Sequence, residues 1–98
     1  MDTIVLENNL SEASKLLSAM SNSHRLMVLC KLLDGEMSVT TLADSVGLSQ
    51  SALSQHLAKL RERNLVATRR EAQTIYYSLA SKDVSAVLLT LYKLYRGD

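Results

Sequence analysis

The chain has 98 residues, enough for one small domain spanning residues 1–98, and its core must be modest, so dimerisation is a natural source of further burial. It has no proline, tryptophan or phenylalanine and only three glycines, which favours helices over a turn-rich β fold. The net charge of +1 is uneven, because residues 49–71 carry five basic against two acidic side chains, whereas residues 1–48 carry three basic against six acidic ones. This distribution predicts that one face of the protein meets an anionic surface.

Several classes of protein are excluded by what the chain lacks. No apolar run is long enough to span a bilayer, and the N-terminus has no basic signal-peptide region, so we expect a soluble cytoplasmic protein without a membrane partner. A single cysteine permits no intrachain disulfide, which fits a reducing compartment. The chain has one cysteine and two histidines, and it has no clustered acid pair or phosphate-binding loop. These residues cannot form a catalytic site, so we expect neither enzyme activity nor a cofactor.

The first half of the chain predicts three helices. Residues 12–20 place apolar side chains at helical spacing, and the polar run 21–23 ends this helix and offers caps for the next. A broad apolar face then continues until Asp34-Gly35. Ser38 is the predicted cap of a short helix over residues 39–46.

Gly47 makes a turn into a further helix over residues 49–63, which completes a helix-turn-helix. At about 100° per residue, Leu53, Leu57 and Leu60 share one narrow arc that faces the core. The opposite arc is small and polar, so its backbone could approach base edges, and Gln55 could bond an adenine through two atoms. A merely solvated helix face is the alternative, but such a face would usually carry more Glu and Lys.

Residues 66–71 and 74–79 read as a two-stranded hairpin whose tip, Ala72-Gln73, lacks the Asn-Gly that a tight turn prefers, so a longer, mobile loop is expected. Of the neighbouring Arg69 and Arg70, one should point towards a phosphate or the minor groove. A last amphipathic helix begins at Ser81 or Lys82. The expected DNA contacts are Ser49, Gln50, Ser51, Ser54, Gln55, His56, Lys59, Arg61, Arg63, Arg69 and Arg70. For His56, packing at the helix edge competes with that role.

Several of these segments resemble a known family of regulators. The segments are Ser21-Asn22-Ser23-His24-Arg25-Leu26, Ser51-Ala52-Leu53-Ser54-Gln55-His56-Leu57, Arg69-Arg70-Glu71 and Ile75-Tyr76-Tyr77-Ser78-Leu79. Over residues 13–95 the chain is similar to the ArsR/SmtB winged-helix repressors, and Leu29-Cys30 and Leu91-Tyr92-Lys93-Leu94-Tyr95 narrow the resemblance to the HlyU/BigR-like branch. The implied fold is mainly α with a small β-hairpin, a winged helix-turn-helix of about five helices and a two-stranded wing.

The resemblance also implies a bacterial transcriptional regulator that acts as a homodimer on double-stranded DNA, with two reading helices in successive major grooves of a palindromic operator. Regulation would be by repression or by displacing a silencing protein. The dimer would be joined through the first and last helices, by Leu16, Leu17, Val84, Val87, Leu88, Leu91, Tyr92 and Tyr95.

The sensing side of the family pattern is incomplete. Metal-sensing members carry cysteines in the helix matching Val39–Val46 or an Asp-x-His in the last helix, and this chain has neither, so we expect no metal site. The sulfide- and oxidant-responsive branch uses two cysteines, of which Cys30 matches one and Arg96 stands at the other position. A disulfide switch within the subunit is therefore unavailable. Cys30 shares a helix face with Leu26 and Leu33, which favours a buried packing role, and one-thiol sensing is the sharper hypothesis.

Two other functional classes stay open. The regulator could lack a thiol switch and be constitutive or controlled by a metal, a small molecule or a partner protein. The winged fold could also serve as a protein-interaction module that reads no DNA, although the clustered arginines and the Ser- and Gln-rich helix argue against it.

Overall fold

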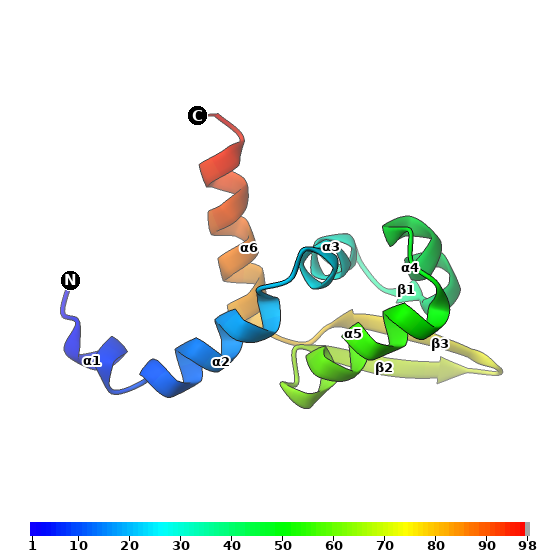
Figure 1. Ribbon diagram of the computed structural model, residues 1–98, viewed down its shortest axis with the longest axis horizontal. Helices are drawn as coiled ribbons and strands as arrows, with labels where there is room; N and C mark the ends of the chain where they lie inside the picture. Colours follow the sequence, from blue (N-terminus) through cyan, green and yellow to red (C-terminus); the bar gives the residue numbers. More distant parts are fainter. Residues whose placement is uncertain (98) are drawn as a thin grey trace.

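The computed structural model describes residues 1–97 and shows a winged helix-turn-helix of six helices and three strands (Figure 1). Helix α6 projects from the body, and α1 and α2 extend away from it at the end opposite the wing tip. The mainly helical fold with a small wing is confirmed, but two short elements, α1 and β1, were not expected. The elements are α1 (Ile4–Glu7), α2 (Leu10–Met20), α3 (Ser23–Leu32), β1 (Met37–Ser38), α4 (Val39–Val46), α5 (Gln50–Glu62), β2 (Val66–Glu71), β3 (Thr74–Leu79) and α6 (Lys82–Tyr95).

Side-chain caps fix the starts of the main helices. The Asn22 side chain accepts hydrogen bonds from the first amides of α3, and Ser38 accepts one from the Thr41 amide in α4. Ser49 and Ser81 do the same for α5 and α6. These bonds satisfy amides that have no partner within the helix, so the polar breaks in the sequence set the helix boundaries.

The helix-turn-helix depends on one left-handed residue. Gly47 has φ 72° and ends α4, and its amide bonds back to the carbonyls of Ala43 and Asp44. Because glycine adopts a positive φ without the steric cost that a Cβ imposes, the turn between α4 and α5 is short and well defined.

The sheet has the strand order β1-β3-β2, and both pairings are antiparallel. The pairing of β2 with β3 continues to Glu71 and Thr74, so only Ala72 and Gln73 connect the strands. The expected longer loop is therefore wrong, whereas the predicted tip, Ala72-Gln73, is confirmed. Ala72 has a left-handed φ of 55°, a conformation that costs a non-glycine residue about 1–2 kcal/mol. The strand pairing on both sides of the turn imposes this conformation.

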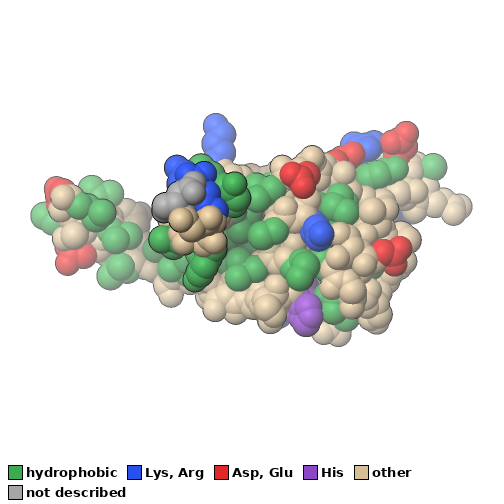
Figure 2. Space-filling model, turned by 90° about the horizontal axis from the view of Figure 1, so that it is seen from above, with side chains coloured by type: hydrophobic (Ala, Val, Ile, Leu, Met, Phe, Trp, Pro, Cys, Tyr) green, Lys and Arg blue, Asp and Glu red, His purple; other side chains and the backbone are tan. Residues whose placement is uncertain are grey.

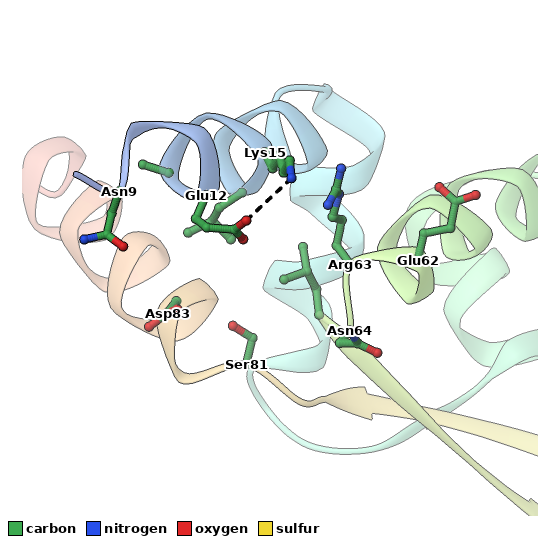
Figure 3. A pocket seen from close by; sticks show the side chains of 11 residues that line it. Asn9, Glu12, Lys15, Glu62, Arg63, Asn64, Ser81 and Asp83 are labelled. Atoms are coloured by element: carbon green, nitrogen blue, oxygen red, sulfur yellow. Dashed lines mark hydrogen bonds and ion pairs between the residues drawn. The ribbon is translucent and has the colours of Figure 1, made fainter. Parts of the chain in front are cut away.

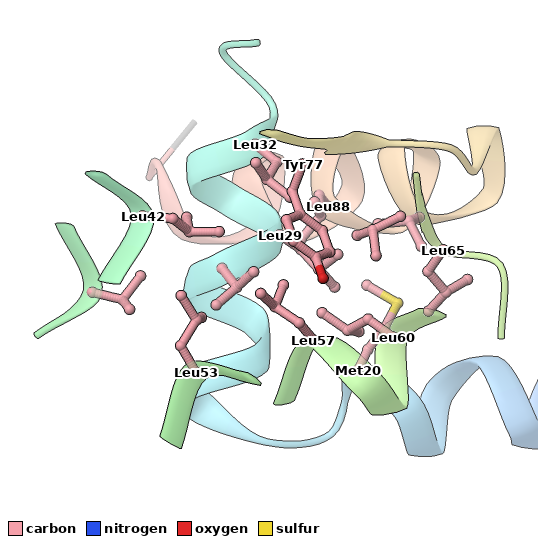
Figure 4. Close-up of a cluster of buried hydrophobic side chains, with 14 of the residues drawn as sticks. Met20, Leu29, Leu32, Leu42, Leu53, Leu57, Leu60, Leu65, Tyr77 and Leu88 are labelled. Atoms are coloured by element: carbon pink, nitrogen blue, oxygen red, sulfur yellow. The ribbon is translucent and has the colours of Figure 1, made fainter. Parts of the chain in front are cut away.

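The core lies between α3, α5 and the sheet (Figure 4). Leu53, Leu57 and Leu60 are at most 1% exposed, which confirms the apolar arc predicted for the reading helix. They pack in the same cluster as Leu29 of α3 and Tyr77 of β3. Burial of one face of α5 therefore turns the opposite, polar face outwards.

Candidate nucleic-acid interface

The outward face of α5 is polar and made of small side chains. Ser51, Ser54 and Gln55 are exposed on it, with Lys59 and Arg61 further along the helix. The Oγ of Ser49 accepts a hydrogen bond from the Ala52 amide at 3.2 Å, and Gln50 donates to Thr40 Oγ1 at 3.4 Å. The latter bond ties the beginning of α5 to α4, so the two helices of the motif present a joint polar edge.

A groove of about 440 Å³ separates this helix from the wing. Gln50, Ser54 and Arg61 line it from α5, and Gln73 and Thr74 line it from the wing. Its lining combines polar side chains and the Arg61 cation with apolar groups such as Leu57, and the polar groups beside a cation suit a nucleic-acid backbone. Thr40, Gln73 and Thr74 were not among the expected contacts, because only the packing of α4 and the wing against α5 brings them to this groove.

The two arginines of the wing stand on opposite faces of the sheet. Arg70 is paired with Ile75, and Ile75 and Tyr77 line the groove beside α5. Arg69 is paired with Tyr76, which lies on the other face because side chains alternate along a strand. Arg70 is therefore the wing cation on the side of the reading helix, and its Nε donates to the Ala72 carbonyl at 3.2 Å.

Arg69 is occupied by protein partners. Its guanidinium donates to Glu36 from Nη2 at 2.6 Å and to Glu71 from Nη1 at 2.7 Å, and it lies 4.5 Å from the centre of the Tyr76 ring. The hydrogen bonds that Arg69 donates, first to Glu36 and second to Glu71, raise the pKa of Arg69, and the bond accepted from Arg69 lowers the pKa of Glu36. Arg69 is thus held in a surface ion-pair network, with 49% of its side chain exposed.

His56 does not belong to the exposed face of α5. It is half-buried, and its ring centre lies 5.5 Å from that of His24 at the start of α3. Burial lowers its pKa, and the nearby charges of Arg25, His24 and Lys59 lower it further. This packing between α5 and α3 is the alternative role expected for His56, and its contact with DNA stays a prediction.

Arg63 lies at the far end of the reading helix. It caps α5 and lines a pocket of about 520 Å³ where α2, the end of α5 and the start of α6 meet (Figure 3). Lys15 and Glu12 of α2, which form an ion pair at 3.5 Å, lie in the same pocket. Arg63 therefore faces this junction, away from the groove beside the wing, and the expectation of a DNA contact is weakest for this residue.

The helices at the other end leave apolar side chains uncovered, and Figure 2 shows hydrophobic groups around α1, α2 and α6. Leu17, Tyr92 and Tyr95 are 55%, 59% and 84% exposed, and Leu16, Val87 and Leu91 are half-buried. Val84 and Leu88, at 0% and 4% exposure, belong to the core of the protomer. Their assignment to a dimer surface is therefore wrong, because the first turns of α6 pack inwards and only its later turns project.

Cys30 is exposed, so the expected buried packing role is wrong. Helix α3 turns Val28, Leu29 and Leu32 towards the core, and at about 100° per residue Cys30 falls on the opposite side. Leu33, on the same side of the helix as Cys30, is 48% exposed. The broad apolar face of α3 in the sequence therefore comprises a buried stripe and an exposed one.

Within residues 1–97, no group of three or more His, Cys, Asp or Glu side chains could hold a metal ion. In the same part of the chain, no helix is long and apolar enough to cross a membrane.

The geometry agrees with comparisons to known proteins. Residues 22–68 match the model of the arsR family of bacterial regulatory proteins. The transcriptional activator HlyU of Vibrio cholerae is 53% identical over 90 residues, which cover 92% of this chain and 83% of that protein. The structure of the repressor BigR from Xylella fastidiosa has a TM-score of 0.93 at 36% identity, with 97% of each chain covered.

A further solved relative is a homodimeric winged helix-turn-helix DNA-binding domain from Mycobacterium bovis, with a TM-score of 0.80, 27% identity, and 95% of this chain and 86% of that chain covered. Sequence and structure therefore point to the same group of proteins. The chain belongs to the arsR family and is a transcriptional regulator with a DNA-binding winged helix-turn-helix.

Proposed function

We propose that the protein binds a palindromic operator as a homodimer, with α5 of each protomer in a major groove and the wing against the neighbouring backbone or minor groove. The observation that carries this proposal is the groove between α5 and the wing, flanked by a helix face of small polar side chains. Small side chains let the helix backbone come close to base edges, and Gln55 supplies a group that can recognise one base pair. Lys59, Arg61 and Arg70 supply cations for phosphates.

Fluorescence anisotropy with DNA from upstream of the protein's own gene tests this function. Wild-type protein should bind one segment of that DNA more tightly than a scrambled duplex of the same length at moderate salt. Replacing Gln55 by Ala should cost about 1–3 kcal/mol on the operator and little on the scrambled duplex. Equal binding of wild type to both duplexes would refute sequence-specific recognition and favour a winged-helix interaction module.

The homodimer is supported by the exposed apolar side chains of α2 and α6 and by the homodimeric state of the Mycobacterium bovis relative. In such a dimer, Leu17, Leu91, Tyr92 and Tyr95 would meet their counterparts or neighbours in the second protomer. Two copies of α5 would then reach successive major grooves about 34 Å apart. Sedimentation at micromolar concentration measures this directly, and a monomer would contradict it.

The response to thiol chemistry rests on Cys30. Its exposure on α3 leaves the thiol open to an oxidant or a persulfide, which could convert it to a sulfenic acid or a mixed disulfide. Mass spectrometry after peroxide or persulfide treatment, with operator binding measured on the same samples, tests this role. The modification should change operator binding in the wild type and leave Cys30→Ser unaffected. An unmodified thiol, or the same response in Cys30→Ser, would leave a regulator without a thiol switch.

A further inference from the structure

One face of the wing carries a chain of side chains that crosses all three strands. Ser38 is paired with Tyr76, and Tyr76 is paired with Arg69, so these positions share the face that points away from α5. Glu36 precedes β1 by one residue and reaches the same face. The Arg69 side chain passes over the Tyr76 ring on the middle strand and meets Glu36 beside the opposite edge strand.

The contact is a surface ion pair with more than one hydrogen bond, and the Arg69 and Glu36 side chains are 49% and 35% exposed. Arg69 Nε lies 3.2 and 3.0 Å from the two carboxylate oxygens of Glu36, and Nη2 lies 2.6 Å from one of them. Nη1 donates to Glu71, two residues along β2, at 2.7 Å. A planar guanidinium that is bonded on two edges and stacked on a ring has one orientation.

The charge of the network argues against a phosphate contact. One arginine is combined with two glutamates, so the cluster is net negative and its acidic groups would repel a phosphate. Arg70 stands on the face beside the reading helix and bonds no carboxylate in the described residues.

The wing projects beyond the third strand of its sheet. Its hairpin is attached to β1 through only two residue pairs, Met37 with Tyr77 and Ser38 with Tyr76, and beyond these pairs it extends as two strands alone. An isolated two-stranded ribbon is at best marginally stable in water, and it twists more than a larger sheet does. The Arg69–Glu36 pair joins β2 to the connection between α3 and β1, near the last of these pairs.

We propose that Arg69 is a positioning residue, which acts through Glu36 to hold the wing at the angle that places Arg70 against the DNA backbone. This inference rests on the proposed DNA-binding function. It assigns the two adjacent arginines different tasks, with Arg69 bracing the wing and Arg70 contacting the phosphate.

Operator binding measured by anisotropy across a salt series separates the two tasks. Arg70→Ala should weaken binding and reduce the slope of log affinity against log salt by about 0.9, as expected for one lost phosphate contact. Arg69→Ala should weaken operator binding severalfold with the slope unchanged. Arg69→Lys should not restore binding, because a lysine keeps the charge but not the two-edged pair.

Glu36→Gln gives the sharpest result, because the two explanations predict opposite signs. Removing a negative charge should tighten DNA binding if only long-range electrostatics matters, as in the matched control Asp44→Asn on α4. The brace predicts weaker binding, by about the same factor as Arg69→Ala, with no further loss in the double variant. Tighter binding by Glu36→Gln, together with a reduced slope in Arg69→Ala and rescue by Arg69→Lys, would overturn the proposal.

Hydrogen exchange of the free protein tests the brace without DNA. Amides of β2 and β3 near the tip should exchange faster in Glu36→Gln and Arg69→Ala, and at the wild-type rate in Arg70→Ala. Unchanged exchange in both network variants would refute the brace. If wild-type protein binds no operator, the proposed function fails, whereas this exchange measurement still decides the role of Arg69.

Discussion

The two ends of the molecule differ in how complete they are within one chain. The reading end, made of α4, α5 and the wing, buries its leucines, caps its helices and encloses its own groove. The end formed by α1, α2 and the later turns of α6 leaves large apolar side chains in solvent. This difference teaches that a single protomer can form the candidate DNA-reading surface, whereas in the proposed dimer its placement against two half-sites depends on a second copy.

The largest effect on operator binding is expected from substitutions at the end of the molecule that leaves apolar side chains in solvent. The double variant Tyr92→Asp/Tyr95→Asp should give a folded monomer, because both rings are more than half exposed and leave the core intact. Its affinity for a full operator should fall by about 10²-fold or more, since each half-site is then bound independently. Sedimentation and anisotropy measure the two effects. The control Thr90→Asp adds charge to the exposed face of α6 away from the tyrosines, and it should remain a dimer.

A core substitution at the reading end should lower stability instead. Leu57 is 1% exposed on the inner face of α5, so Leu57→Ala should cost about 2–5 kcal/mol of unfolding free energy. Leu94 is 67% exposed on α6, and Leu94→Ala should cost much less in urea unfolding at low protein concentration. Equal losses in the two variants would show that the ends are not independent.

Two matched helix caps, one at the start of α5 and one at the start of α6, allow the reading end to be compared with the other end. Ser49 and Ser81 each accept a backbone amide bond at 3.2 Å, one at the start of α5 and one at the start of α6. Replacing either by Ala should cost roughly 0.5–2 kcal/mol of stability. Only Ser49→Ala should also weaken operator binding at a temperature where both variants are folded. An equal loss of binding in Ser81→Ala would contradict the division between the ends.

The smallest effect concerns pH. The pKa of His56 in the folded protein lies below its ordinary value of 6.5, so the unfolded chain binds this proton more readily. The unfolding free energy should therefore decrease as the pH falls from about 6.5 towards the lowered pKa. His56→Gln should flatten the stability profile in that interval, measured by denaturant unfolding at several pH values. An unchanged profile would mean that His56 titrates alike in both states.

Local features of the fold were predictable because they repeat within a few residues. The arc of Leu53, Leu57 and Leu60, the caps at Ser38 and Ser49, and the glycine turn all depend on neighbours along one helix. Helix α1 has four residues and buries none of them, so no amphipathic pattern marks it. Strand β1 exists only because two residues meet β3, some forty positions later in the chain.

Parts of the candidate site could not be predicted from the sequence, because they depend on contacts between segments far apart in the chain. The adjacent arginines look alike in the sequence, and only the strand register and the arrival of Glu36, 33 residues away, give them different surroundings. In the sequence, Val84 and Leu88 look like the other apolar residues of α6, but the first turns of this helix pack on the core and bury both side chains. The sequence predicted that Cys30 is buried on the apolar face of α3, but the other side of this helix faces the core and Cys30 is exposed.

By itself, the sequence determined the helix-turn-helix, the polar face of α5 and the concentration of positive charge beside it, because periodicity, capping and composition are local properties. The tertiary structure decided which arginine is ion-paired to Glu36, which apolar side chains of α6 stay exposed and which side of α3 carries the thiol. Each of these features depends on contacts between segments far apart in the chain, and no local sequence pattern indicates which segments will be in contact.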